Sequence, residues 1–216
     1  MAKKRILCFG DSNTWGYNPK NLQRYDDEVR WTGVLQATLG DEYTVIEEGQ
    51  NGRTIALDDW TDGLKNGLKY AKACIESQSP LELMIVMLGT NDLKSKYKLK
   101  PYDIGREMDY FLQQIIAHNQ YMLRNQDMRI LVMSPPHMSD GLKTTWIGEE
   151  YNPEEAIEYS KGLAKEFRRY ARLYKCSFLD TASLVETSPY DGCHMAPDMH
   201  EILGKAVADK VKEILG

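Results

Sequence analysis

The sequence predicts an α/β protein: a three-layer α/β/α sandwich around a flavodoxin-like, five-stranded parallel sheet. Three observations support this fold. Five short apolar runs alternate with segments of helical periodicity, which is the pattern of βαβ units. Two of the runs, Leu81–Leu88 and Arg129–Ser134, are almost continuously apolar, as expected of strands covered on both faces. The 216 residues suit one such domain and no linker divides them, so we expect a single domain over residues 1–216.

The expected elements follow one another along the chain. The strands are expected at Arg5–Phe9, Tyr43–Glu47, Leu81–Leu88, Arg129–Ser134 and Ser177–Asp180. The helices are expected at Trp31–Leu39, Gly63–Glu76, Tyr102–Asn125, Pro153–Tyr174 and Asp198–Leu215. Gly40 is a stop signal after the first helix, and Pro153 suits the first turn of the fourth. Ligands bind beyond the carboxyl ends of the strands in such sheets, so the residues after each strand are the candidates for a functional site.

Composition and charge exclude several classes of protein. Hydrophobic residues make up 42% of the chain and charged residues 27%, as in an ordinary globular protein. The formal net charge is −5, and this acidic balance does not indicate the basic surface that binds nucleic acid. No apolar run approaches the roughly 20 residues of a membrane span. The run after the basic Met1–Arg5 stops at Gly10, too early for a signal peptide. We therefore expect a cytoplasmic protein with no nucleic-acid partner, no membrane partner, no metal and no cofactor.

Three of the predicted strands end in turns whose residues suit acyl chemistry. The first ends in a Gly-Asp-Ser-Asn turn that exposes the hydroxyl of Ser12 at the edge of the sheet. The second is followed by a glycine-containing turn that ends at Gly52, whose N–H can face an oxyanion. The third runs into Gly-Thr-Asn-Asp, where the neutral amide of Asn91 is a suitable oxyanion donor. Each turn alone is equally explained by ordinary capping.

An Asp-Gly-Cys-His segment precedes the last helix. A serine hydroxyl needs a base, and an imidazole needs a carboxylate on its other nitrogen. Asp191 stands three residues before His194 on a loop with a glycine between, so it can fold back onto the imidazole. We expect Ser12, His194 and Asp191 to act together. Two alternatives stay open: Asp180, which ends a strand, as the acid, and Cys193 as a thiol nucleophile.

In this order, the four motifs resemble the blocks of the SGNH (GDSL-like) hydrolase family, namely GDS, a glycine-containing turn, GxND and DxxH. The longer stretches Arg5–Ser12, Arg30–Leu35, Val45–Gly49 and Met87–Asp92 look like the bacterial arylesterase/acyltransferase (perhydrolase) branch. The resemblance implies the SGNH hydrolase fold and a serine esterase that hydrolyses small esters, with a short acyl or an aryl group, through an acyl-enzyme. The resemblance also implies transfer of the acyl group to alcohols or peroxide.

The resemblance also implies roles for individual residues. The amides of Ser12 and Gly52 and the side chain of Asn91 are expected to form the oxyanion hole. Trp15 and Trp31 are expected to bind substrate, from their nearness to the nucleophile and from the resemblance.

The chain departs from the family pattern in two places. Asn13 stands where the GDSL motif has Leu, so pocket polarity is expected to differ, and the segment 137–152 does not align. A mycobacterial member of the branch is a multimer, which implies a homo-oligomer here. Two other functions remain as alternatives: a carbohydrate O-acetyl esterase, and a non-catalytic binding module for acylated ligands.

Overall fold

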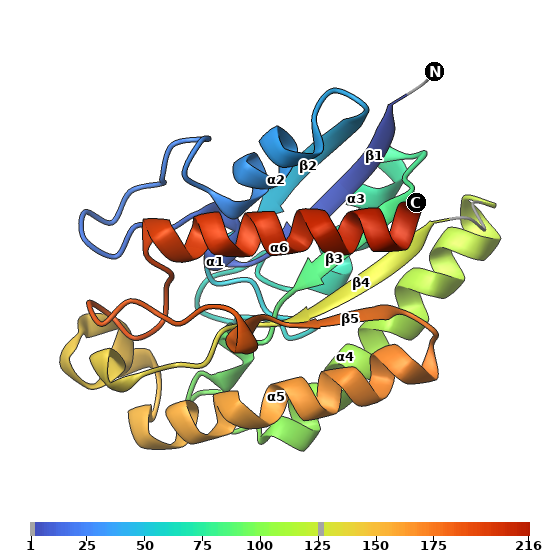
Figure 1. The fold of residues 1–216 in the computed structure, drawn as a ribbon. Helices are drawn as coiled ribbons and strands as arrows, with labels where there is room; N and C mark the ends of the chain where they lie inside the picture. Colours follow the sequence, from blue (N-terminus) through green and yellow to red (C-terminus); the bar gives the residue numbers. More distant parts are fainter. Residues whose placement is uncertain (1–2, 125–127) are drawn as a thin grey trace.

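The computed structural model, which describes residues 3–124 and 128–216, contains a five-stranded sheet (Figure 1). Its strands are β1 (Lys4–Gly10), β2 (Tyr43–Gly49), β3 (Leu83–Met87), β4 (Arg129–Ser134) and β5 (Ser177–Asp180). The strand order is β2-β1-β3-β4-β5, and every neighbouring pair is parallel. The order reverses between β1 and β3, which is the switch point where open parallel sheets bind their ligands.

Helices cover both faces of the sheet. They are α1 (Ser12–Trp15), α2 (Trp31–Leu39), α3 (Gly67–Gln78), α4 (Pro101–Ala117), α5 (Pro153–Leu173) and α6 (Pro197–Leu215). Helices α2 and α6 pack together on one face, and α3, α4 and α5 lie on the other (Figure 1). The predicted three-layer α/β/α sandwich is confirmed.

The central strand β3 shows why its sequence is continuously apolar. Met84 and Val86 point into the core under α3, α4 and α5. Leu83, Ile85 and Met87 point into the core under α2 and α6. Successive side chains of a strand face opposite sides, and here both sides are buried, so no position is left for a polar residue.

Two helix boundaries differ from the predicted ones for local reasons. Helix α3 begins at Gly67, later than expected, because the Asn66 side chain caps it by accepting a backbone N–H of the first turn. Helix α4 ends at Ala117, and a π-helical turn, His118–Met122, follows it. The expected end at Asn125 lies outside the described residues.

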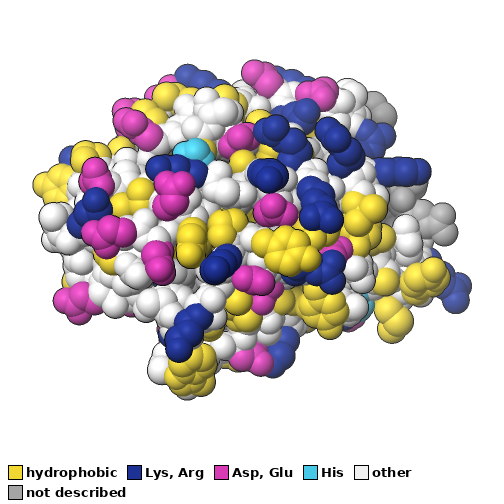
Figure 2. Space-filling view, turned by 90° about the horizontal axis from the view of Figure 1, so that it is seen from below, with side chains coloured by type: hydrophobic (Ala, Val, Ile, Leu, Met, Phe, Trp, Pro, Cys, Tyr) yellow, Lys and Arg dark blue, Asp and Glu magenta, His cyan; other side chains and the backbone are white. Residues whose placement is uncertain are grey.

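The basic cluster near the end of α5 is a solvated helix face. Arg168, Arg169 and Arg172 are exposed, and Arg168 lies 3.5 Å from Asp180. Figure 2 shows Lys and Arg side chains on this side of the molecule among acidic and hydrophobic ones. Within residues 3–124 and 128–216, no helix is long and apolar enough to cross a bilayer.

Candidate active site

Ser12, His194 and Asp191 form a continuous hydrogen-bonded chain. Ser12 lies two residues after the end of β1, at the switch point of the sheet. Nε2 of His194 lies 2.8 Å from Oγ of Ser12, and Nδ1 lies 2.6 Å from Oδ2 of Asp191. All three residues are buried. A carboxylate on Nδ1 favours the tautomer that carries its proton there, which leaves Nε2 free to accept the proton of the serine hydroxyl.

The Asp191 carboxylate holds its own loop as well as the imidazole. Its Oδ1 accepts the backbone N–H groups of Cys193 and His194, both at 3.0 Å. Burial alone would raise the pKa of Asp191, but the hydrogen bonds and charge of His194 and these amides outweigh burial and lower it. Gly192 has φ +64°, and a Cβ there would lie 2.3 Å from the Leu142 amide, so the turn requires glycine.

Ser12, the predicted nucleophile, lies at a capped strand-to-helix turn. The Asp11 carboxylate accepts the Asn13 amide at 3.0 Å and so caps α1, a short helix that the sequence analysis did not predict. Burial raises the pKa of Asp11 to about 6, although the Asn13 amide and His194 pull it down. Ser12 is the first residue of α1, so its N–H has no acceptor within the helix and is available to an oxyanion.

Asn13 joins the nucleophile turn to the histidine loop. Its side-chain N–H donates to the Cys193 carbonyl, and its side-chain oxygen accepts the Met195 N–H, both at 3.1 Å. The two bonds lie on either side of His194. Asn13 is buried and does not line the cavity that opens at Ser12 and His194, so its effect is on the loop rather than on the polarity of that cavity.

The two other predicted oxyanion donors lie on neighbouring loops that are bonded to each other. Gly52 has φ +79°, and both Gly52 and Asn91 line the same cavity as the nucleophile. The Asn91 side chain donates one N–H to the Arg53 carbonyl at 3.1 Å, which leaves its second N–H for substrate. The next residue, Asp92, accepts the Ile55 amide at 2.9 Å. The third motif therefore fixes the loop that carries Gly52.

Two further carboxyl groups lie behind this loop. Burial, followed by the negative charge of Glu107, raises the pKa of Asp92 well above its ordinary value. Burial also raises the pKa of Glu107, from α4, to about 7, although a hydrogen bond from the Ala56 amide opposes the rise. Because Asp92 holds Ile55 and Glu107 holds Ala56, two protonatable groups support the segment that follows Gly52.

The catalytic cavity has a volume of about 190 Å³. Its lining comes from several loops: Ser12, Tyr17, Asn51, Gly52, Asp62, Lys65, Asn91, Lys94, Trp146, Ile147, Glu150, Tyr151, Cys193 and His194. The Tyr17 ring packs on the imidazole of His194, with 4.3 Å between ring centroids. A cavity of this size holds a small group rather than a long acyl chain.

The segment 137–152, which did not align with the family, forms one wall of the cavity. Its 3₁₀ turn, Trp146–Glu150, supplies several lining residues. Glu150 forms an ion pair with Lys94, and its carbonyl accepts the Ser95 amide at 3.0 Å. Sequence reasoning missed Lys94 and this wall. The one available signal in the sequence was a tryptophan, Trp146, within a polar segment.

The two tryptophans expected to bind substrate do not line the catalytic cavity. Trp31 is 1% exposed in the core between α2 and α6, and its amide donates to Nδ1 of His200 at 3.3 Å. Trp15 lies against Tyr17, with 6.4 Å between ring centroids, and beneath Arg24. Nearness in sequence to the nucleophile was a poor guide, because α2 turns the Trp31 side chain into the core.

The structure also bears on the two alternative reactive groups. Asp180 ends β5, where its carboxylate accepts the Ser134 hydroxyl at 3.3 Å, and it is not the carboxylate bonded to His194. Cys193 does line the cavity, but burial raises the pKa of its thiol well above the ordinary value. A thiol that stays protonated is a weak nucleophile.

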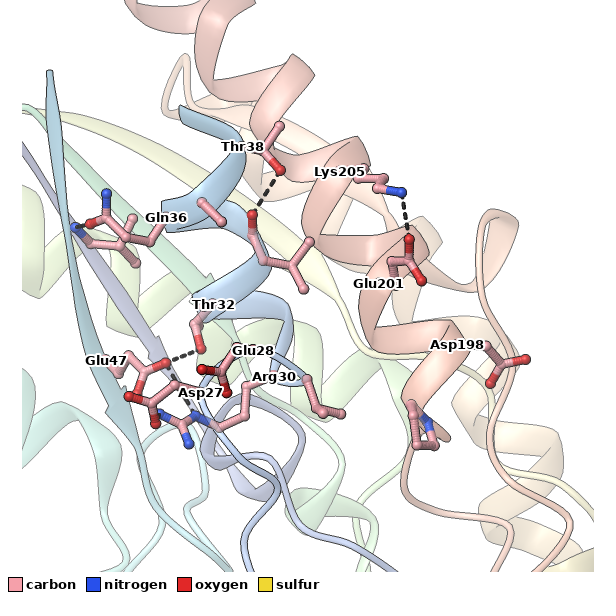
Figure 3. A pocket seen from close by; sticks show the side chains of 16 residues that line it. Asp27, Glu28, Arg30, Thr32, Gln36, Thr38, Glu47, Asp198, Glu201 and Lys205 are labelled. Atoms are coloured by element: carbon pink, nitrogen blue, oxygen red, sulfur yellow. Dashed lines mark hydrogen bonds and ion pairs between the residues drawn. The ribbon is translucent and has the colours of Figure 1, made fainter. Parts of the chain in front are cut away.

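A larger groove lies elsewhere among the described residues. It measures about 960 Å³ and runs between α2, β2 and the start of α6 (Figure 3). Its charged groups face each other: Glu47 turns toward Thr32 and Arg30, and Glu201 toward Lys205. None of the residues expected to do chemistry lines it, so the smaller cavity is the candidate active site.

Comparison with known proteins gives the family. The sequence model of the GDSL-like lipase/acylhydrolase family matches residues 8–202. The native aryl esterase of M. smegmatis is 36% identical, with a TM-score of 0.91 over 98% of this chain and 100% of that chain. Est24, a carbohydrate acetylesterase from Sinorhizobium meliloti, is 35% identical, with a TM-score of 0.91 over 99% and 100%. A search of curated proteins gave no match. The chain belongs to the GDSL-like lipase/acylhydrolase family and is an ester hydrolase.

Proposed function

We propose that this protein is a serine esterase that hydrolyses small carboxylic esters, with a short acyl or an aryl group, through an acyl-enzyme on Ser12. The observation that carries this proposal is the hydrogen-bonded chain from Asp191 through His194 to Ser12, which opens on a cavity of about 190 Å³. The chain supplies an activated nucleophile, and the cavity supplies space for a small ester.

The first half of the reaction forms the acyl-enzyme. Oγ of Ser12 attacks the ester carbonyl as its proton passes to Nε2 of His194, and Asp191 stabilises the resulting imidazolium. The carbonyl oxygen becomes an oxyanion, held by the Ser12 and Gly52 amides and by the Asn91 side chain. The C–O bond to the leaving alcohol then breaks, and the alcohol takes its proton from His194.

The second half releases the acid. Water gives a proton to His194 and attacks the acyl carbonyl, the same donors hold the second oxyanion, and the bond to Ser12 breaks as its oxygen regains the proton. An alcohol or peroxide that enters in place of water yields an ester or a peracid. Tyr17, Trp146 and Ile147 beside the nucleophile favour an organic alcohol over water as the acceptor, since their surfaces are largely apolar. The yield of ethyl ester in aqueous ethanol measures this transfer.

A carbohydrate O-acetyl esterase is the second candidate. Two ion pairs line the catalytic cavity, Asp62 with Lys65 at 3.0 Å and Glu150 with Lys94. Such polar groups suit a hydroxylated alcohol better than a hydrocarbon. A non-catalytic binding module is disfavoured, because binding alone does not need an intact proton-transfer chain.

Hydrolysis of p-nitrophenyl esters from acetate to octanoate, by the wild type and by Ser12→Ala, tests the proposed function. We expect turnover on the shortest chains, a decline with chain length, and loss of turnover in the variant. A folded wild type without activity on any of these esters would contradict the simple esterase. Turnover that survives Ser12→Ala would contradict the assigned nucleophile.

The other sequence-based expectations remain predictions. These are one domain, a cytoplasmic location and a homo-oligomer. Light scattering at micromolar concentration tests the oligomer, and a monomer would reject it.

A further inference from the structure

One buried arginine is bonded to the three segments that carry the expected oxyanion donors. Arg53 follows Gly52 in the turn after β2 and is 2% exposed. It does not line the cavity that opens at Ser12 and His194. We propose that Arg53 is a positioning residue of the ester site, whose side chain sets the distances between the three donors without touching the substrate. Its effect on turnover rests on the proposed function.

The Arg53 guanidinium joins the ends of two strands at the edge of the sheet. Its Nη1 donates to the Gly10 carbonyl at 2.9 Å and also to the Glu48 carbonyl. Gly10 ends β1 two residues before Ser12, and Glu48 belongs to β2, shortly before the turn that contains Gly52. Because one nitrogen atom binds both carbonyls, it restricts the separation of the two segments where they leave the sheet.

The same residue also holds the turn that contains Gly52. Nε of Arg53 donates to Oε1 of Gln50 at 3.2 Å, and its backbone N–H donates to the Gln50 carbonyl at 3.1 Å. The Gln50 amide donates in turn to the Gly10 carbonyl, also at 3.1 Å. Gly52 lies between the two bonded residues, Gln50 and Arg53, so their contacts restrict the direction of its N–H.

The third donor is bonded to the backbone of Arg53. The Arg53 carbonyl accepts one side-chain N–H of Asn91 at 3.1 Å, and this bond orients the amide whose second N–H is expected to face the oxyanion. Because the guanidinium and the carbonyl belong to one residue, a backbone shift that follows loss of the side-chain bonds also moves the acceptor of Asn91.

Two aromatic rings hold the guanidinium in place. Its central carbon lies 4.2 Å from the centroid of the Phe9 ring and 5.2 Å from that of the Tyr70 ring. A planar guanidinium can pack on a ring while its N–H groups donate to several acceptors, whereas an ammonium is a compact point charge. Lysine at this position can therefore replace only part of the set of contacts that arginine makes.

A cavity separate from the catalytic one gives small molecules access to Arg53. It has a volume of about 570 Å³, and its lining includes Glu48, Gln50, Arg53 and Tyr70. Removal of the arginine side chain leaves the carbonyls of Gly10 and Glu48 without this charged donor. A guanidinium ion that enters from the cavity can donate to the same carbonyls, so the lost contacts can be restored chemically.

Kinetics of Arg53→Ala and Arg53→Lys test the effect on turnover. We expect kcat and kcat/KM of Arg53→Ala for p-nitrophenyl acetate to fall together by about 10², because misplaced oxyanion donors weaken binding of the transition state rather than of the ester. Arg53→Lys should recover part of the loss, and millimolar guanidinium chloride should raise kcat of Arg53→Ala. Melting temperatures recorded beside kcat show that each variant is folded in the assay.

Arg5→Ala is the matched control. The Arg5 side chain also donates to a carbonyl, that of Gln78, but it lies near the opposite end of β1 from the site. We expect Arg5→Ala to keep the kcat of the wild type and to show no response to guanidinium. A folded Arg53→Ala with the kcat of the wild type would leave Arg53 a structural role only and would overturn the inference.

The side-chain amide of Asn91 gives a readout that does not depend on ester turnover. In isotope-labelled protein, its two N–H signals in the nuclear magnetic resonance spectrum are those that disappear in Asn91→Ala. We expect both Arg53 variants to shift these signals and to speed solvent exchange of the N–H that binds the Arg53 carbonyl, and Arg5→Ala to leave both properties unchanged. Unchanged Asn91 signals in the two Arg53 variants would overturn the inference. A wild type that hydrolyses no ester would instead contradict the proposed function, while these signals still decide the role of Arg53.

Discussion

Nδ1 of His194 lies 2.6 Å from Oδ2 of Asp191, and the other oxygen of the same carboxylate accepts the amides of Cys193 and His194. One side chain therefore sets both the orientation of the imidazole and the shape of the loop that carries it. A substitution at Asp191 can therefore affect the loop, the charge beside the imidazole, or both. Asparagine separates the two effects, because it keeps an oxygen for the loop amides but loses the negative charge.

Asp191→Asn tests the electrostatic role of this carboxylate. We expect kcat for p-nitrophenyl acetate to fall by about 10⁴, because the uncharged amide neither fixes the productive tautomer nor stabilises the imidazolium. Asp180→Asn is the control, since Asp180 bonds Ser134 and not His194. A greater loss of kcat in the control than in Asp191→Asn would assign the acid role to Asp180 instead.

Asn91→Ala tests the oxyanion hole. Removing one donor from such a site costs about 10²–10³ in turnover, so we expect a severely impaired but active enzyme. The variant also loses the bond to the Arg53 carbonyl, and its melting temperature should be recorded beside kcat. Full turnover would remove Asn91 from this role.

Asn13→Leu restores the residue of the GDSL motif and tests the link to the histidine loop. It removes two buried hydrogen bonds, to Cys193 and Met195, so we expect a loss of about 1–3 kcal/mol in the free energy of unfolding. Because the bonds lie on either side of His194, we also expect kcat to fall more than KM changes. Denaturant titration and steady-state kinetics measure the two effects. An unchanged kcat and an unchanged free energy of unfolding would show that the loop holds its position without Asn13.

Glu107→Gln tests the protonation of the group behind the oxyanion loop. Burial raises the pKa of Glu107 from 4.5 to about 7, so the folded protein keeps a proton that the unfolded chain loses between these values. The stabilisation from this group is present at low pH and is lost as the pH rises through about 7. Urea titrations across this range should show a smaller decline in Glu107→Gln than in the wild type. Parallel declines would contradict the assignment.

The fold and the residues of the candidate site were predictable because their signals are local. Apolar runs such as that of β3 mark strands buried on both faces, and the Ser12, Asn91 and Asp191–His194 motifs each follow a strand or precede a helix. The structure brings these motifs to one cavity, at the edge where parallel strands end.

The rest depends on partners that are far apart in the chain. Asn13 bonds a carbonyl 180 residues away, and Trp146 lines the cavity from a segment that Glu150 pairs with Lys94. The Trp31 side chain lies in the core because its position on helix α2 places it on the buried face of that helix. No spacing pattern in the sequence encodes these three outcomes.

Covalent trapping tests the central claim most directly. The wild type, treated with a fluorophosphonate that forms a stable adduct with activated serines, would be digested and mapped by mass spectrometry. The account predicts one adduct per chain, on Ser12, with much slower labelling in His194→Ala because the base is missing. An adduct on Cys193, or full esterase activity without a labelled Ser12, would contradict it.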